Sequence, residues 1–159
     1  MMAAALLQGM GLKTGLHTSP YLQMPTEKLM VNGESASLQG FADLVWQFKE
    51  IHAAWAAADG PFNQLRYTEA WTAITFMWLA QQKLDCAVVE AGMGGRLDPT
   101  NHMASDIAII TNVAFDHVKS LGPELTDIAW HKAGIIKLGK PAVTGVTEPE
   151  LLAVVAQEA

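Results

Sequence analysis

Short apolar runs alternate with longer helical segments along the second half of the chain, and this alternation limits the possible folds most strongly. The runs cover residues 87–90, 107–111 and 141–144. None of them alternates apolar with polar residues, which is typical of strands that are covered on both faces. Strands that alternate with helices predict an α/β domain with a mostly parallel sheet and helices on both faces.

Five stretches carry helical patterns. The expected helices cover residues 2–10, 38–58, 68–82, 123–133 and 151–156. Ser37 is a suitable N-cap for the second helix, whose apolar residues recur at i, i+3 and i+4 spacings. Gly9 and Gly11 are expected to end the first helix, and Asp59-Gly60-Pro61 to end the second.

Two further strands are expected in the first half, at residues 13–18 and 28–31. The second ends at Asn32-Gly33, which is a turn signal. With no repeat or linker along the chain, residues 1–159 are predicted to form one domain. An α/β domain usually begins with a strand, whereas this chain begins with a helix. We therefore expect that the first strand and its loop are missing.

Composition excludes several classes of function. Half of the 159 residues are hydrophobic, 16% are charged and the net charge is −6, so we expect a packed core and no disorder. An acidic chain lacks the basic face that nucleic acids or anionic membranes require, so neither is expected as a partner. The single cysteine, Cys86, permits neither a disulfide framework nor a CxxC zinc site, which favours a reducing cytoplasm.

Polar residues follow several of the expected strands. Ligands of open parallel sheets collect beyond the carboxyl ends of the strands. The polar residues at these ends are His17, Thr18, Ser19, Glu90, the glycine-rich stretch 92–101, Thr111, Asn112, Asp116, His117 and the stretch 132–137. Each has a structural explanation as well: a turn-forming serine before proline, an ion-paired glutamate, a tight glycine turn, or a lysine that supports a helix dipole. Their common position favours a ligand site.

Four segments resemble motifs of the folylpolyglutamate and dihydrofolate synthases, which belong to the Mur ligase superfamily. Residues 90–101 are similar to the E-x-G-x-G-G-R-x-D-x-T-N signature of that family. Residues 15–22 resemble its G-x-x-T-S-P-x-L segment, and residues 116–122 its D-H-x-x-x-L-G stretch. Residues 132–137 match its K-A-G-I-[IF]-K run. The motifs follow the order of the family and cover most of residues 15–145.

The resemblance implies a metal centre. Ser19 and Glu90 would bind a Mg²⁺ ion that bridges to ATP, since hydroxyl and carboxylate oxygens are hard ligands. His117 would contribute to a second metal position, which its imidazole would make more suitable for Mn²⁺. Lys132 is similar to a lysine that these enzymes carbamylate with CO₂, and the new carboxylate would help to hold the second metal. His117 and Lys132 are therefore also the catalytic candidates.

The resemblance also implies a loop close to substrate or nucleotide. Gly94 and Gly95 would allow a substrate or a phosphate to approach the backbone. Arg96 and Asp98 are expected to order that loop. Asn101 and Asn112 complete the residues that are expected near the substrate or the nucleotide.

The implied fold is the P-loop NTPase-like, ATP-binding central domain of a Mur ligase. In the implied reaction, ATP phosphorylates a glutamyl carboxylate of a folate, and the amine of L-glutamate then displaces phosphate from the acyl phosphate. ATP, a folate or dihydropteroate and L-glutamate are thus the expected partners. The parent enzyme is expected to act as a monomer.

The chain departs from the family pattern at its start. The glycine-rich phosphate-binding loop that ends in Gly-Lys-Ser is absent. Residues 9–14 imitate it, but they lack a glycine before the lysine and follow a helix instead of a strand. Pro99 stands where alanine is usual, and His131 where glutamate commonly precedes the lysine. We therefore expect a piece of a ligase, without the first strand, the P-loop and the C-terminal ligase domain, that is inactive alone.

Two alternatives stay open. Another Mur-superfamily ligase would share the general pattern, although Thr-Ser-Pro and the Gly-Gly-Arg-Leu-Asp string favour the folate branch. A non-catalytic, degenerate domain would explain the missing phosphate loop. Retention of Ser19, Glu90, His117 and Lys132 argues against that second alternative.

Overall fold

The computed structural model describes residues 1–57 and 64–159. The chain divides into two compact units, Met1–Glu90 and Ala91–Ala159, each with its own helices and strands. The single domain expected over residues 1–159 stays a prediction. The expected break at Asp59-Gly60-Pro61 lies outside the described residues.

The first unit contains a four-stranded sheet in the order β3-β2-β1-β4. Its strands are β1 (Thr14–His17), β2 (Met30–Val31), β3 (Glu34–Ser35) and β4 (Cys86–Val89). β1 runs parallel to β4, from Thr14 opposite Cys86 to His17 opposite Val89. β2 pairs antiparallel with both β1 and β3. The sheet is therefore mixed, with its parallel pair at the β4 edge.

The hairpin between β2 and β3 confirms the predicted turn at Asn32-Gly33. Both residues have a positive φ, 51° at Asn32 and 80° at Gly33, as a two-residue hairpin loop of this kind requires. The prediction that the strand begins at Lys28 was wrong. Residues Pro25–Lys28 form the 3₁₀ helix η1, in which Pro25 takes a position near the start that tolerates a missing N–H.

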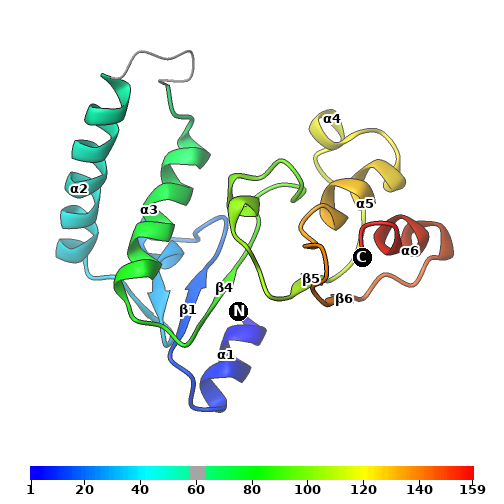
Figure 1. Cartoon of the computed structure of the whole chain (residues 1–159), viewed down its shortest axis with the longest axis horizontal. Helices are drawn as coiled ribbons and strands as arrows, with labels where there is room; N and C mark the ends of the chain where they lie inside the picture. The colour runs from blue at the N-terminus through cyan, green and yellow to red at the C-terminus, as the bar shows by residue number, and fades with distance from the viewer. Residues whose placement is uncertain (58–63) are drawn as a thin grey trace. The chain divides into compact units, whose positions relative to one another are not determined.

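Within the described residues, the α-helices of this unit are α1 (Met2–Gly9), α2 (Leu38–Ala56) and α3 (Tyr67–Gln81). Ser37 caps α2 as predicted, because its Oγ accepts a hydrogen bond of 3.0 Å from the backbone N–H of Gly40. Figure 1 shows α2 and α3 side by side, and a core cluster lies in this part of the unit. The buried members of the cluster are Leu29, Ala36, Leu44 and Ile74.

β1 is buried along its whole length. A side-chain atom added at Gly15 would meet the Leu79 side chain of α3, and His17 contacts Thr75 of the same helix. Because side chains alternate along a strand, Thr14 and Leu16 point to the opposite face. α1 contacts both β1 and β4. The strand that carries the Thr-Ser-Pro segment is therefore held rigidly.

The second unit pairs β5 (Ala108–Ile110) with β6 (Ala142–Thr144) in parallel. Its helices are η2 (Pro99–His102), α4 (Val118–Leu121), α5 (Leu125–Ala133) and α6 (Pro149–Ala156). The short helix α4 was not predicted. Ala108 and Ile110 pack in one core cluster with residues of α5 and α6, whereas Ile109 and Val143 are half-exposed. The predicted α/β class is confirmed.

None of the helices within residues 1–57 and 64–159 combines the length and the apolar character that a bilayer-spanning helix needs.

Gly145 is expected to tolerate no side chain. A Cβ at this position would overlap the backbone carbonyl oxygen of Thr111, and backbone cannot move aside as a flexible side chain can. We predict that Gly145→Ala lowers the free energy of unfolding by about 1–3 kcal/mol in urea denaturation. Gly9→Ala is the control, because nothing lies within 4 Å of its added Cβ. Equal stabilities of the two variants would contradict the packing described for β6.

Candidate functional site

Two residues of the predicted metal centre meet in the first unit. Parallel pairing of β1 with β4 brings the segments after both strands together, and the backbone N–H of Glu90 donates to the carbonyl of His17 at 3.1 Å. Beyond this bond, the backbone N–H of Ser19 donates to Oε2 of Glu90 at 3.0 Å. Glu90 is exposed and Ser19 is half-buried, so both oxygen-bearing side chains are accessible from solvent.

Glu27 organises the segment that follows Ser19. Its carboxylate accepts hydrogen bonds from the backbone N–H groups of Leu22, Gln23 and Met24, at 2.8, 3.0 and 2.8 Å. The bonds from Leu22 and Met24 hold the pKa of the Glu27 carboxyl below its usual value, because they favour the charged form. The carbonyl of Glu27 also accepts from Oγ1 of Thr18 at 3.2 Å. The Thr-Ser-Pro loop is thus anchored on both sides of Ser19.

Lys28, which sequence reasoning did not select, contacts Ser19, one of the metal-ligand candidates. Its side chain is buried, with 6% of the residue exposed, and its Nζ donates to Oγ of Ser19 at 3.2 Å. The carbonyl of Lys28 lies 3.0 Å from Nδ1 of the buried His17, and the same nitrogen lies 3.1 Å from Oγ1 of Thr75. The sequence signal for Lys28 was a charged residue next to a buried strand. It was not recognised, because residue 28 was itself assigned to the expected strand.

The donor set of Ser19 and Glu90 fits a hard divalent cation. Mg²⁺ usually takes one or two carboxylates from a protein and fills its other positions with water or phosphate oxygens. Within residues 1–57 and 64–159, no three His, Cys, Asp or Glu side chains gather as a protein-only metal cage would need. A hydroxyl and one carboxylate therefore suit an ion that keeps several outer ligands.

The glycine-rich loop of the second unit is organised by Asp98. Its Oδ2 accepts from the backbone N–H groups of Gly92 and Met93 at 3.0 and 3.2 Å. Its Oδ1 accepts from the backbone N–H of Thr100 at 2.9 Å and also from the Thr100 hydroxyl. These bonds close the loop on itself, in the way that was expected of an ordering residue.

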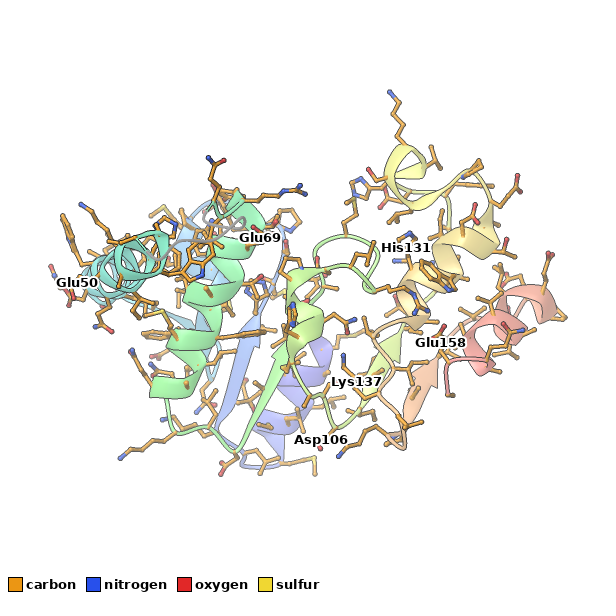
Figure 2. All side chains as sticks on the ribbon, turned by 45° about the horizontal axis from the view of Figure 1, so that its top comes forward. Glu50, Glu69, Asp106, His131, Lys137 and Glu158 are labelled. Carbon is orange, nitrogen blue, oxygen red and sulfur yellow. The ribbon has the colours of Figure 1, made fainter. Side chains whose placement is uncertain are left out.

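Arg96 attaches the same loop to α5. Its guanidinium lies 3.9 Å from the ring centroid of Trp130 and forms an ion pair with Glu158. Glu158, labelled in Figure 2, follows α6. Its backbone N–H donates to the carbonyl of His131 at 2.7 Å. These contacts agree with the ordering role that was expected of Arg96.

Asn101 and Lys137 connect the loop to the segment after α5. The side-chain amide of Asn101 donates to the carbonyls of Arg96 and Gly134, both at 3.0 Å. Nζ of Lys137 donates to the carbonyl and to Oδ1 of Asn101, both at 2.7 Å. Two motifs that are far apart in the sequence, the Gly-Gly-Arg loop and the Lys-Ala-Gly-Ile-Ile-Lys run, thus form one hydrogen-bonded body.

Gly94 and Gly95 lie close to other parts of the second unit. Both have a positive φ, 67° and 149°. A Cβ at Gly94 would meet Leu121 and His131, and one at Gly95 would meet Ile135 and the carbonyl of His131. Close packing is sufficient to explain both glycines. Their predicted approach to a substrate or a phosphate stays a prediction.

The remaining candidates also lie in the second unit. His117 has a left-handed conformation with φ 48°, immediately before α4, and its exposed Nε2 lies 3.7 Å from Oδ1 of Asp116. Lys132 is half-buried in the last turn of α5. Asn112 is exposed and accepts a long hydrogen bond from Thr111. The roles expected of His117, Lys132 and Asn112 stay predictions.

Several known proteins are similar to this chain over nearly its whole length. The chain is 37% identical, over 96% of its length, to the folylpolyglutamate synthase of Lacticaseibacillus casei, and 38% identical, over 98%, to the dihydrofolate synthase/folylpolyglutamate synthase of Bacillus subtilis. Over nearly its whole length, the chain is a homologue of the folylpolyglutamate and dihydrofolate synthases. It spans 36% of the length of each of these two relatives. No protein-family model matches the chain.

Solved structures of the folylpolyglutamate synthase family agree with the fold. A complex of a folylpolyglutamate synthase with AMPPCP and folate matches 98% of the chain with a TM-score of 0.87 at 34% identity, and 38% of that protein is covered. FolC of Escherichia coli, in complex with DHPP and ADP, matches 98% of the chain with a TM-score of 0.85 at 36% identity, and 36% of it is covered. The predicted relation to the Mur ligase type of domain is confirmed.

Asp98→Asn is expected to loosen the glycine-rich loop. An amide would present an N–H₂ group to backbone donors that now share a carboxylate, and each lost bond of this kind costs about 1–3 kcal/mol. We predict that hydrogen exchange at the amides of Gly92, Met93 or Thr100 becomes at least about tenfold faster. Asp106→Asn, which removes the negative charge that pairs with the exposed Lys140, is the control. Unchanged protection in Asp98→Asn would show that the loop is held by other contacts.

Proposed function

We propose that this chain supplies the metal-binding central part of an ATP-dependent ligase that adds L-glutamate to a folate. The observation that carries the proposal is the pairing of Ser19 with Glu90 after two parallel strands. Its motifs, its relatives and the solved complexes of similar proteins with AMPPCP, ADP and folate support the same reaction class.

In the proposed site, Oγ of Ser19 and the carboxylate of Glu90 would hold Mg²⁺, which would supply positive charge to offset the negative charge of phosphates. The Ser19 N–H fixes one oxygen of Glu90, which leaves the other carboxylate oxygen available. Glu27 keeps the loop after Ser19 in place through its three backbone bonds. The chain therefore orients both ligands before any cation arrives.

The second unit contributes His117 and Lys132 to a second metal position in this proposal, with Mn²⁺ as an alternative to Mg²⁺ there. Carbamylation needs a neutral Lys132 amine, which attacks CO₂ and releases a proton to give a carboxylate. Anchoring of the glycine-rich loop on α5 through Arg96 keeps Gly94, Gly95 and Asn101 in a fixed relation to that helix. Asn112 follows β5, near which a substrate is expected.

The proposed reaction has two steps. The terminal phosphate of ATP passes to a glutamyl carboxylate of the folate, with ADP as the leaving group. The amine of L-glutamate then attacks the acyl phosphate, and phosphate leaves as the amide forms. Both steps accumulate negative charge on oxygen, which fixed cations and N–H donors stabilise.

The proposal for the whole enzyme extends beyond this chain, which spans about a third of its relatives. No Gly-Lys-Ser loop occurs in the 159 residues. We therefore propose that the chain alone does not turn over substrate. For the complete enzyme we propose a monomer that works in the cytoplasm.

A chimera tests the proposal. Residues 1–159 replace the matching segment of the Lacticaseibacillus casei folylpolyglutamate synthase, and transfer of labelled glutamate to tetrahydrofolate is measured with MgATP. We predict measurable transfer, and a loss of about 100-fold or more for Ser19→Ala and for Glu90→Gln. Glu50→Gln, on the exposed side of α2, is the control and leaves the rate unchanged.

Two results would contradict the proposal. A folded chimera without activity would favour a non-catalytic, degenerate binding domain. An active chimera that is indifferent to Ser19→Ala and Glu90→Gln would show that the metal site lies elsewhere.

A further inference from the structure

A buried cation lies directly against the proposed metal site. Lys28 exposes only 6% of its surface, and its Nζ donates to Oγ of Ser19 at 3.2 Å. Lysine is rarely buried to this extent, because removing an ammonium from water is costly. The position of this charge at one of the two metal ligands therefore calls for an explanation.

The backbone and the surroundings of Lys28 fix this position. Lys28 is the last residue of η1, its carbonyl lies 3.0 Å from Nδ1 of His17, and the next residue, Leu29, is fully buried. Its Nζ also lies 5.6 Å from the ring centroid of Trp71 on α3, an arrangement that favours a cation. The side chain thus differs from a surface lysine, which moves freely out of the way of an incoming ion.

We propose that Lys28 acts as a charge gate on the Ser19–Glu90 site. Its ammonium lowers the affinity for a free divalent cation, so that the cation binds well only together with an anion such as a polyphosphate. This inference rests on the proposed function, which assigns the metal to Ser19 and Glu90. The repulsion by Lys28 would explain why the metal binds as a complex with its phosphate ligand and not as a free ion.

The sign and the size of the effect follow from electrostatics. An ammonium has donors only, so its bond to Ser19 uses one lone pair of Oγ and leaves the other for a metal. A unit charge and a divalent ion about 5 Å apart repel each other enough to weaken binding at least about tenfold, even at the dielectric constant of water. A polyphosphate placed next to both charges removes this penalty, because it attracts each of them.

A purely structural role of Lys28 would have the opposite consequence. If its hydrogen bond served only to orient Ser19, its loss would disorder the ligand and weaken metal binding. The gate predicts instead that removing the charge strengthens binding. A gain of affinity also cannot result from a damaged fold, which makes the sign of the change decisive.

The test is titration of the whole chain with Mn²⁺ alone, at low ionic strength, with free Mn²⁺ measured by electron paramagnetic resonance. We predict that Lys28→Met binds Mn²⁺ at least about tenfold more tightly than the unchanged chain. Lys28→Arg retains the charge and is expected to bind as the unchanged chain does. Lys49→Met is the matched control, because Lys49 also lies over a tryptophan, Trp46, but on the exposed side of α2.

Two further readouts use the same titration. The difference between Lys28→Met and the unchanged chain is expected to shrink as KCl is raised, because salt screens the repulsion. The preference for the Mn²⁺–AMPPCP complex over free Mn²⁺ is expected to fall at least about tenfold in Lys28→Met.

The variants Ser19→Ala and Glu90→Gln separate failure of the gate from failure of the metal site. If Glu90→Gln abolishes Mn²⁺ binding while Lys28→Met leaves it unchanged or weaker, the gate is overturned and the metal site stands. If neither the unchanged chain nor Lys28→Met shows binding that depends on Glu90, both the gate and the metal site are overturned.

Discussion

The parallel pairing of β1 with β4 is the constraint on which the proposed metal site depends. In this register the backbone N–H of Glu90 donates to the carbonyl of His17. The segment that follows β1 then brings the N–H of Ser19 to the Glu90 carboxylate. Because β1 is buried along its whole length, neither segment can shift without disturbing the core. The two oxygen ligands are therefore oriented by the sheet, and the bonds of Glu27 to the following loop only maintain that arrangement.

The proposed metal site of the first unit brings together two opposite charges, those of Glu90 and Lys28. Glu90 offers a carboxylate to a cation, while the buried Lys28 places a positive charge against Oγ of Ser19. With this ammonium beside them, Ser19 and Glu90 are poorly suited to hold a bare divalent ion and well suited to hold one that arrives with negative phosphates. The second unit uses charge differently, since the Arg96–Glu158 and Lys137–Asn101 contacts fasten the glycine-rich loop to the segments that follow α6 and α5.

Much of this fold could be predicted because its signals are local. Ser37 caps α2 and Asn32-Gly33 forms the hairpin turn, and both features depend only on residues that are adjacent in sequence. The family motifs could be located for the same reason, because each is a short continuous segment that follows a strand. What could not be predicted depends on tertiary contacts. Residue 28 was placed in a strand because it precedes an apolar run, yet Pro25 and the bonds of Glu27 favour a 3₁₀ turn there. The close approach of Gly94 and Gly95 to α5 likewise follows from packing, which one sequence does not reveal.

The central claim is that Ser19 and Glu90 together hold a divalent cation. Crystals of the chain soaked in saturating Mn²⁺ test it most directly, through the anomalous scattering of the metal. The account predicts a peak about 2.0–2.3 Å from both Oγ of Ser19 and an oxygen of Glu90, with water or phosphate oxygens at the other positions. A peak held by other side chains, or no ordered peak beside Glu90 at saturation, would contradict it.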